Sequence, residues 1–160
     1  MSIQKGDKLP NAVFGTMDKS GPSVLETDSF FKGKKIVLFS VPGAFTPTCS
    51  ARHLPGFVQS AADFKAKGVD LIACTAVNDV FVMDAWGKAQ KADGKVMMLA
   101  DGNGEFVKAL GLELDARGFG MGARGQRFSM IINDGVIVEL NIEEPGAFNV
   151  SSAEHALGQL

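Results

Sequence analysis

Three short apolar runs, separated by segments with helical spacing, constrain the fold of this chain more than any other feature. The runs are KIVLFSV at residues 35–41, VDLIACTAV at 69–77 and KVMMLA at 95–100. Their continuous apolar character is typical of strands buried on both faces of a sheet. Between them, residues 49–66 and 79–91 carry apolar side chains along one side of a helix. This alternation predicts a parallel sheet with helices packed on it.

Local signals place the helix boundaries. Pro55 lies inside the first helical segment and should kink it or break it in two. Asn78 or Asp79 is expected to cap the second helical segment. A short helix is expected over residues 105–110, and Ser151–Glu154 has the form of a capping box that opens a last helix.

Two hairpins complete the predicted fold. RFSMIIN and VIVELNI flank Asp134 and Gly135, a strong signal for a tight antiparallel hairpin. Residues 12–17 and 22–26 resemble a second, peripheral hairpin. We therefore expect an α/β protein with one domain over residues 1–160. The expected architecture is a thioredoxin-like three-layer α/β/α sandwich with a mixed central sheet and an extra N-terminal β-hairpin.

Composition argues against several functions. A net charge of −2 gives no basic field, so we expect neither nucleic-acid nor membrane binding. The N-terminal residues MSIQKGDKLP lack a signal-peptide pattern, and no window approaches transmembrane length. Two cysteines and two histidines make neither a disulfide scaffold nor a convincing zinc site. We expect a cytoplasmic, reducing location, where a cysteine outside the core is more often catalytic or redox-active.

Cys49 is the candidate nucleophile. It follows the first apolar run in the stretch VPGAFTPTCS, where loops at the carboxyl ends of parallel strands bind ligands. The start of the following helix favours a thiolate over a thiol. Thr46 occupies the place of the first cysteine of a C-x-x-C motif, so no local disulfide can form. Pro42 and Pro47 stiffen the loop and predict a narrow pocket, suited to a small substrate such as a peroxide.

Two other interpretations of Cys49 remain open at this point. The cysteine could be a buried small hydrophobic residue, although its Thr-Pro-Thr flank argues against that. His53, four residues later, could act as a base in a Cys-His hydrolase or transferase. A thioredoxin-like redox sensor or chaperone that is oxidised without turnover is the remaining alternative.

The residues around Cys49 resemble a known active-site signature. P-x-x-x-T-x-x-C, here Pro42, Thr46 and Cys49, is similar to that of the peroxiredoxins. The longer run VPGAFTPTC, with SARHLPGF, VNDVFVMDAW, LADGNGEF and RFSMII, resembles the type II (peroxiredoxin-five) subfamily over nearly the whole chain. The resemblance implies a thiol-dependent peroxidase that needs no metal or organic cofactor and reduces hydrogen peroxide and alkyl hydroperoxides through a Cys49 sulfenic acid.

The resemblance also implies roles for individual residues. Thr46 would form hydrogen bonds with Cys49 and the peroxide, Pro42 would shield the pocket, and Arg127 would be the active-site arginine. From the residues alone we expect a guanidinium near Cys49, but they do not distinguish Arg127 from Arg52 or Arg124.

Partners follow from the same resemblance. Glutathione with glutaredoxin, or thioredoxin, would reduce the sulfenic acid, and two chains would form a non-covalent homodimer with contacts near the active-site loops. Cys74, within the second apolar run, is either a core cysteine or a resolving cysteine. The glycine-rich segment 120–125 is interpreted as a flexible loop, with Phe119 or Met121 exposed for packing.

Overall fold

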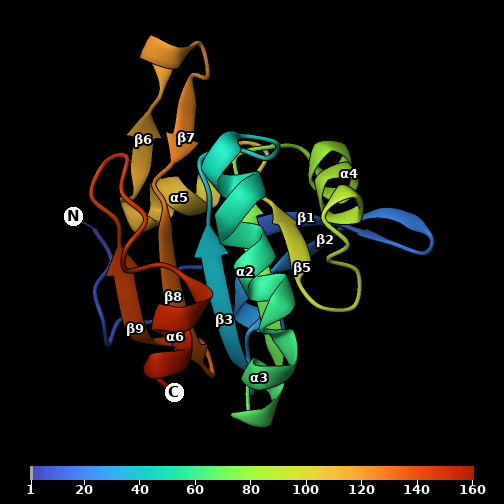
Figure 1. Ribbon diagram of the computed structural model, residues 1–160, viewed down its shortest axis with the longest axis vertical. Coiled ribbons are helices and arrows are strands. Elements are labelled where there is room, and N and C mark those ends of the chain that lie inside the picture. Colours follow the sequence, from blue (N-terminus) through green and yellow to red (C-terminus); the bar gives the residue numbers. More distant parts are fainter. Residues whose placement is uncertain (1) are drawn as a thin grey trace.

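A seven-stranded mixed sheet runs through the computed structural model, which describes residues 2–160 (Figure 1). Its strands, in spatial order, are β2 (Gly21–Glu26), β1 (Val13–Asp18), β5 (Met97–Ala100), β4 (Leu71–Ala76), β3 (Lys35–Ser40), β8 (Phe128–Asn133) and β9 (Val136–Ile142). β3, β4 and β5 are parallel to one another, whereas β1 and β8 flank them in antiparallel orientation. The three apolar runs are therefore the centre of the sheet, as predicted.

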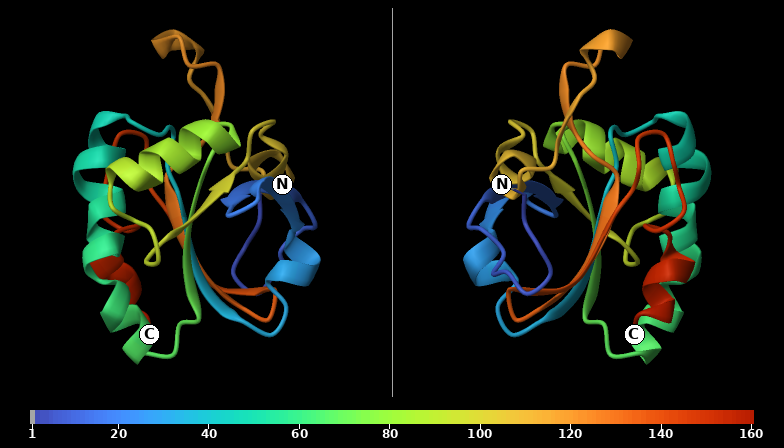
Figure 2. Two further views of the ribbon diagram at one scale, coloured as in Figure 1. Left: turned by 90° about the vertical axis from the view of Figure 1, so that its right-hand side faces the viewer. Right: turned by 90° about the vertical axis from the view of Figure 1, so that its left-hand side faces the viewer.

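Helices cover both faces of this sheet and complete the predicted α/β/α layers (Figure 2). Their bounds are α1 (Thr27–Phe30), α2 (Leu54–Gln59), α3 (Ala61–Ala66), α4 (Val80–Ala89), α5 (Glu105–Leu110) and α6 (Ala153–Gly158). Within residues 2–160, none of the helices combines the length and the apolar character needed to cross a membrane.

The alternation of side chains along β3 divides the core into two clusters. Val37 and Phe39 face α2, α3, α4 and α6, whereas Ile36 and Leu38 face α5 and the residues around α1. All four side chains are fully buried. Successive side chains of a strand point to opposite faces, so a continuous apolar strand must be covered on both. The two helical layers follow from that requirement.

Several predicted boundaries hold and two need correction. Asp79 caps α4 by accepting from the Val82 N–H group at 2.9 Å. Asp134 and Gly135 form the β8–β9 turn, both with positive φ, as a type I′ hairpin turn requires. The cap of α6 is Ser152, which accepts from the His155 N–H group, because the Ser151 hydroxyl is bonded elsewhere.

The second correction concerns the helix after β3. Pro55 does not break it, because the helix widens just before the proline and continues to Gln59. The interruption lies instead at Ser60, between α2 and α3.

The N-terminal hairpin is part of the sheet rather than a separate appendage. β1 and β2 pair in antiparallel register, and β1 also pairs with β5 at Gly15 and Ala100. The predicted hairpin is confirmed, and its attachment adds two strands to one edge of the sheet.

A two-stranded arm projects from the sheet at the end toward which β3 points (Figures 1 and 2). It consists of β6 (Glu113–Asp115) and β7 (Ala123–Gly125), joined through a short 3-10 helix at Arg117–Phe119. The sequence predicted a flexible glycine-rich loop here. The arm forms because Gly120 and Gly122 adopt positive φ values of 71° and 70°, which lets the chain reverse tightly.

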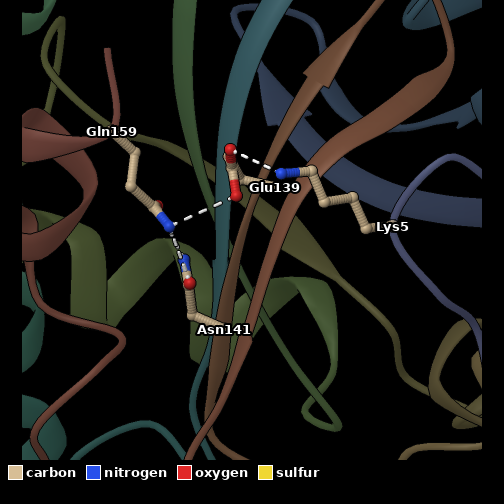
Figure 3. Close-up of polar contacts among 4 residues, drawn as sticks. All are labelled: Lys5, Glu139, Asn141 and Gln159. Atoms are coloured by element: carbon tan, nitrogen blue, oxygen red, sulfur yellow. Dashed lines mark hydrogen bonds and ion pairs between the residues drawn. The ribbon is translucent and has the colours of Figure 1, made fainter.

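Both terminal segments are attached to β9 through polar side chains (Figure 3). Lys5 Nζ lies 3.0 Å from Glu139 Oε1. Asn141 and Gln159 exchange two amide hydrogen bonds of 2.8 Å each, one in either direction. These bonds hold α6 against the sheet, and the residues just before α6 lie beside the candidate active site.

Candidate active site

Cys49 lies in the first turns of the helix that follows β3. The helix begins at Pro47, and residues Cys49–His53 form a π-helical turn in which the Leu54 N–H group bonds to the Cys49 carbonyl. Pro55 has no N–H group for an α-helical bond and its ring would crowd the Ala51 carbonyl, so a wider turn before it relieves the conflict. Cys49 is fully buried, and its sulfur is enclosed by neighbouring residues rather than exposed on the helix surface.

Arg127 supplies the guanidinium beside the sulfur. It lies just before β8, whose first residue Phe128 pairs with Ser40 at the end of β3. Its Nη2 donates to Cys49 Sγ at 3.1 Å, and its Nη1 donates to His53 Nδ1 at 2.7 Å. A positive charge at this distance stabilises a thiolate.

The other two candidate arginines are engaged elsewhere. Arg52 lies over the Phe148 ring, with its guanidinium carbon 4.7 Å from the ring centroid. Arg124 donates to the Met121 carbonyl at 2.8 Å and to the Pro42 carbonyl at 3.5 Å. Of the three arginines, Arg127 is thus the one whose guanidinium donates to Cys49 Sγ.

His53 is a buried, neutral hydrogen-bonding residue and not a base for Cys49. Its Nε2 lies 2.8 Å from the Ser151 carbonyl oxygen, which can only accept, so Nε2 carries the proton. Nδ1 then accepts from Arg127, and neither ring nitrogen is available to the sulfur. Burial, and next the charge of Arg127, lower the pKa of His53 to about 3. The Cys-His interpretation is wrong because both nitrogens already have other partners.

Thr46, in the loop before Cys49, makes a different hydrogen bond from the one expected, and the Pro42 carbonyl of the same loop accepts from Arg124. The Thr46 hydroxyl donates to the Gly43 carbonyl at 2.7 Å, and within residues 2–160 it has no hydrogen bond to Cys49. Its proton is thus used within the loop, while its oxygen can still accept from a ligand. The Ala44 N–H group donates to Asn78 at 2.9 Å and so ties the loop to the end of β4.

Cys74 lies in the middle of β4, fully buried in the same apolar cluster as Cys49. Both cysteines are free thiols. Burial, and next the nearby Cys49, raise the pKa of the Cys74 thiol well above its ordinary value. A protonated thiol is a poor nucleophile, so Cys74 is not activated in this conformation.

Sequence reasoning assigned no site role to several residues that contact the site. Trp86 of α4 donates from Nε1 to the Ser50 hydroxyl at 3.0 Å, beside Cys49. Phe148 and Ser151 reach His53 from the segment after β9. That segment has no periodic pattern that would have indicated its path, because loops follow tertiary contacts rather than local propensity. No group of three or more His, Cys, Asp or Glu side chains within residues 2–160 is arranged to hold a metal ion.

Comparison with known proteins gives matches over almost the whole chain. A family model described as Redoxin matches residues 4–157. The chain is 50% identical to Peroxiredoxin-2E, chloroplastic, from Arabidopsis thaliana, with 99% of the chain and 70% of that protein covered. It is 45% identical to Peroxiredoxin-2B of the same plant, with 99% and 98% covered.

Solved structures agree with these relatives. The structure of reduced Prx3 in complex with H2O2 from Vibrio vulnificus superposes with a TM-score of 0.95 at 54% identity, with 98% of each chain covered. Peroxiredoxin 5 from Alvinella pompejana has a TM-score of 0.85 at 37% identity, with 97% of this chain and 96% of that chain covered. In both cases the likeness extends over nearly the whole chain.

Proposed function

The chain belongs to the Redoxin family and is a peroxiredoxin, a thiol-dependent peroxidase, and from this premise we propose that Cys49 is the residue that reduces hydrogen peroxide and alkyl hydroperoxides. The observation that carries this proposal is the 3.1 Å hydrogen bond from Arg127 Nη2 to Cys49 Sγ. It places a fixed positive charge at the sulfur, where both a thiolate and a departing oxygen need one.

The reaction proceeds by attack of the Cys49 thiolate on one peroxide oxygen. The S–O bond forms as the O–O bond breaks, and the departing oxygen leaves with the electron pair and takes up a proton to become water or an alcohol. Cys49 is oxidised to a sulfenic acid and the peroxide is reduced. Arg127 stabilises the charge that develops on the departing oxygen, and the free lone pair of Thr46 Oγ1 accepts from the peroxide O–H group. Pro42 limits access to the sulfur.

An external thiol returns Cys49 to its working state. The first thiol condenses with the sulfenic acid to a mixed disulfide and water, and a second thiol releases Cys49 and a disulfide. Glutathione with glutaredoxin, or thioredoxin, supplies these thiols in a reducing compartment such as the cytoplasm. The high pKa and burial of Cys74 favour this route over a Cys49–Cys74 disulfide.

A non-covalent homodimer is the assembly that fits the exposed aromatic residues at this end of the molecule. Phe45 follows β3 and Phe81 follows β4, and their exposed fractions are 57% and 64%. Phe119, in the arm, is 84% exposed. Exposed aromatic side chains at one end of a molecule are typical of protein interaction surfaces.

The test is peroxide consumption by wild type, Cys49→Ser and Cys74→Ser, coupled either to thioredoxin or to glutathione with glutaredoxin. We expect Cys49→Ser to abolish consumption with both donors and Cys74→Ser to retain it. Full turnover by Cys49→Ser would disprove the proposed nucleophile. Oxidation of one Cys49 per chain without turnover, whichever donor is added, would indicate a redox sensor instead.

A further inference from the structure

Glu143, which directly follows β9, has a carboxylate that organises the loop leading to α6. It is only 7% exposed. The Asn149 N–H group donates to both carboxylate oxygens at 2.9 and 2.8 Å, and the N–H groups of Val150 and Ser151 donate to Oε2 at 2.9 and 2.8 Å. The Ser151 hydroxyl adds a fifth bond of 2.6 Å. Three consecutive residues are thus fixed around one side chain.

This carboxylate is stabilised by hydrogen bonds rather than by a cation. Within residues 2–160, no ion pair involves Glu143. Burial alone would raise the pKa of Glu143, but the bonds from Ser151, Asn149 and Val150 outweigh it and keep the pKa below its ordinary value. The side chain is therefore charged at neutral pH, and hydrogen bonds to a charged acceptor are stronger than those to a neutral one.

The loop that Glu143 fixes contacts the active site at two points (its chain is red-orange in Figure 1). The Ser151 carbonyl accepts from His53 Nε2 at 2.8 Å. The Phe148 ring lies 4.9 Å from the His53 ring, and its centroid is 5.9 Å from the Arg127 guanidinium carbon. Ser151 bonds to Glu143 and to His53 with different atoms of the same residue, so its position depends on both.

A continuous series of hydrogen bonds therefore joins Glu143 to the nucleophile. Glu143 fixes Ser151, Ser151 fixes His53, and His53 accepts from the Arg127 nitrogen that does not face Cys49. The Glu143 backbone N–H group also donates to the Arg127 carbonyl at 3.0 Å, so Glu143 contacts Arg127 directly as well as through Ser151 and His53.

We infer that Glu143 is a positioning residue, which holds the loop over residues 144–151 so that His53 keeps the Arg127 guanidinium directed at Cys49. This inference rests on the proposed function of Cys49 and Arg127. Under this inference Glu143 affects the reactivity of the Cys49 sulfur although it does not contact the peroxide.

The test is Glu143→Gln, measured by two readouts. A glutamine keeps the size of the side chain, but its NH2 group replaces an acceptor and would face backbone donors. We expect the pH midpoint of iodoacetamide alkylation of Cys49, quantified by mass spectrometry of its peptide, to move upward. We expect the rate constant for reaction with H2O2 to fall by about 10- to 100-fold, because a misplaced charge loses its effect steeply.

Asp101→Asn is the matched control. Asp101 is also a buried carboxylate that accepts from backbone N–H groups, those of Phe106 and Val107 at 3.0 and 3.1 Å, but it caps α5 on the other face of the sheet. We expect it to lower stability without moving the alkylation midpoint. An equal shift in Asp101→Asn would overturn the inference, because general destabilisation would then explain both variants.

Ser151→Ala keeps the inference testable if Glu143→Gln does not fold. This variant removes only the hydroxyl bond to Glu143 and leaves the carbonyl that faces His53, so a smaller shift in the same direction is expected. An unchanged alkylation midpoint in the folded variants would overturn the positioning role. A wild-type protein that does not react with H2O2 would count against the proposed function alone, because the alkylation profile does not depend on peroxide.

Discussion

The two terminal nitrogens of Arg127 donate to different partners, and this arrangement requires a particular protonation state of His53. One nitrogen faces Cys49 and the other faces His53. A lysine could not donate to both partners in this fixed geometry, because its ammonium is a single charged group on a flexible side chain. His53 must remain uncharged for this arrangement, since a protonated ring would present a donor and a positive charge to the guanidinium.

The low pKa of His53 predicts a pH dependence of stability. The unfolded chain binds a proton near the ordinary value of 6.5, whereas the folded protein does so only near 3. As the pH falls below 6.5, the unfolded state gains a proton that the folded state does not, so the free energy of unfolding decreases. The slope from this one residue should rise to about 1.4 kcal/mol per pH unit once the unfolded histidine is fully protonated.

Urea unfolding of wild type, His53→Gln and His155→Gln between about pH 7 and pH 5 measures this slope. We expect His53→Gln to lose the contribution and His155→Gln, the control at the other histidine, to keep it. The same pH dependence in wild type and His53→Gln would show that folding does not shift the pKa of His53.

At the scale of the elements, the helix that carries Cys49 is held in place by α4. Among residues 2–160, a single side-chain hydrogen bond joins this helix to α4, and it runs from Trp86 Nε1 to the Ser50 hydroxyl. Trp86 is fully buried. A buried donor that loses its acceptor costs more than the bond itself contributes.

We therefore expect Ser50→Ala to lower the free energy of unfolding by about 1–3 kcal/mol. In a Trp86→Phe background the same change should cost much less, because no indole N–H group remains to be left without a partner. Chemical denaturation of the four proteins of this double-mutant cycle measures the coupling. Equal costs in both backgrounds would mean that the bond does not link the two helices.

The elements also show which parts of the structure the sequence could predict. β3 and β4 were predictable because strands buried on both faces must be apolar throughout. The cap at Asp79 was predictable because the side chain of a capping residue accepts from an N–H group two or three residues later. The arm at 113–125 was missed because its strands are three residues long, too short for a periodic signal. The prediction of Cys49 as nucleophile rests on its loop alone, whereas the bonds of His53 depend on a segment about a hundred residues further along the chain.

For the whole molecule, the end that carries the active site is also the end with exposed aromatic residues. The arm extends this surface beyond the sheet (Figure 2). If the second copy covers it, Phe119 should be one of the residues that stabilise the dimer most, since aromatic anchors dominate interface energetics.

We expect Phe119→Ser to weaken dimerisation by about 2 kcal/mol or more, which is roughly thirtyfold or more in the dissociation constant. Val24→Ser is the matched control, because Val24 is 76% exposed but lies on β2 at the far edge of the sheet. Sedimentation velocity over a range of protein concentrations measures both. Equal dimerisation of wild type and Phe119→Ser would place the interface elsewhere.

The hydrogen bond between Trp86 and Ser50 also has a consequence for the intrinsic fluorescence of the protein. The chain has one tryptophan and no tyrosine, so its near-ultraviolet fluorescence comes from Trp86. That indole is buried and bonded to the residue next to Cys49. The intrinsic emission of the unlabelled protein is therefore a local probe of the surroundings of Cys49.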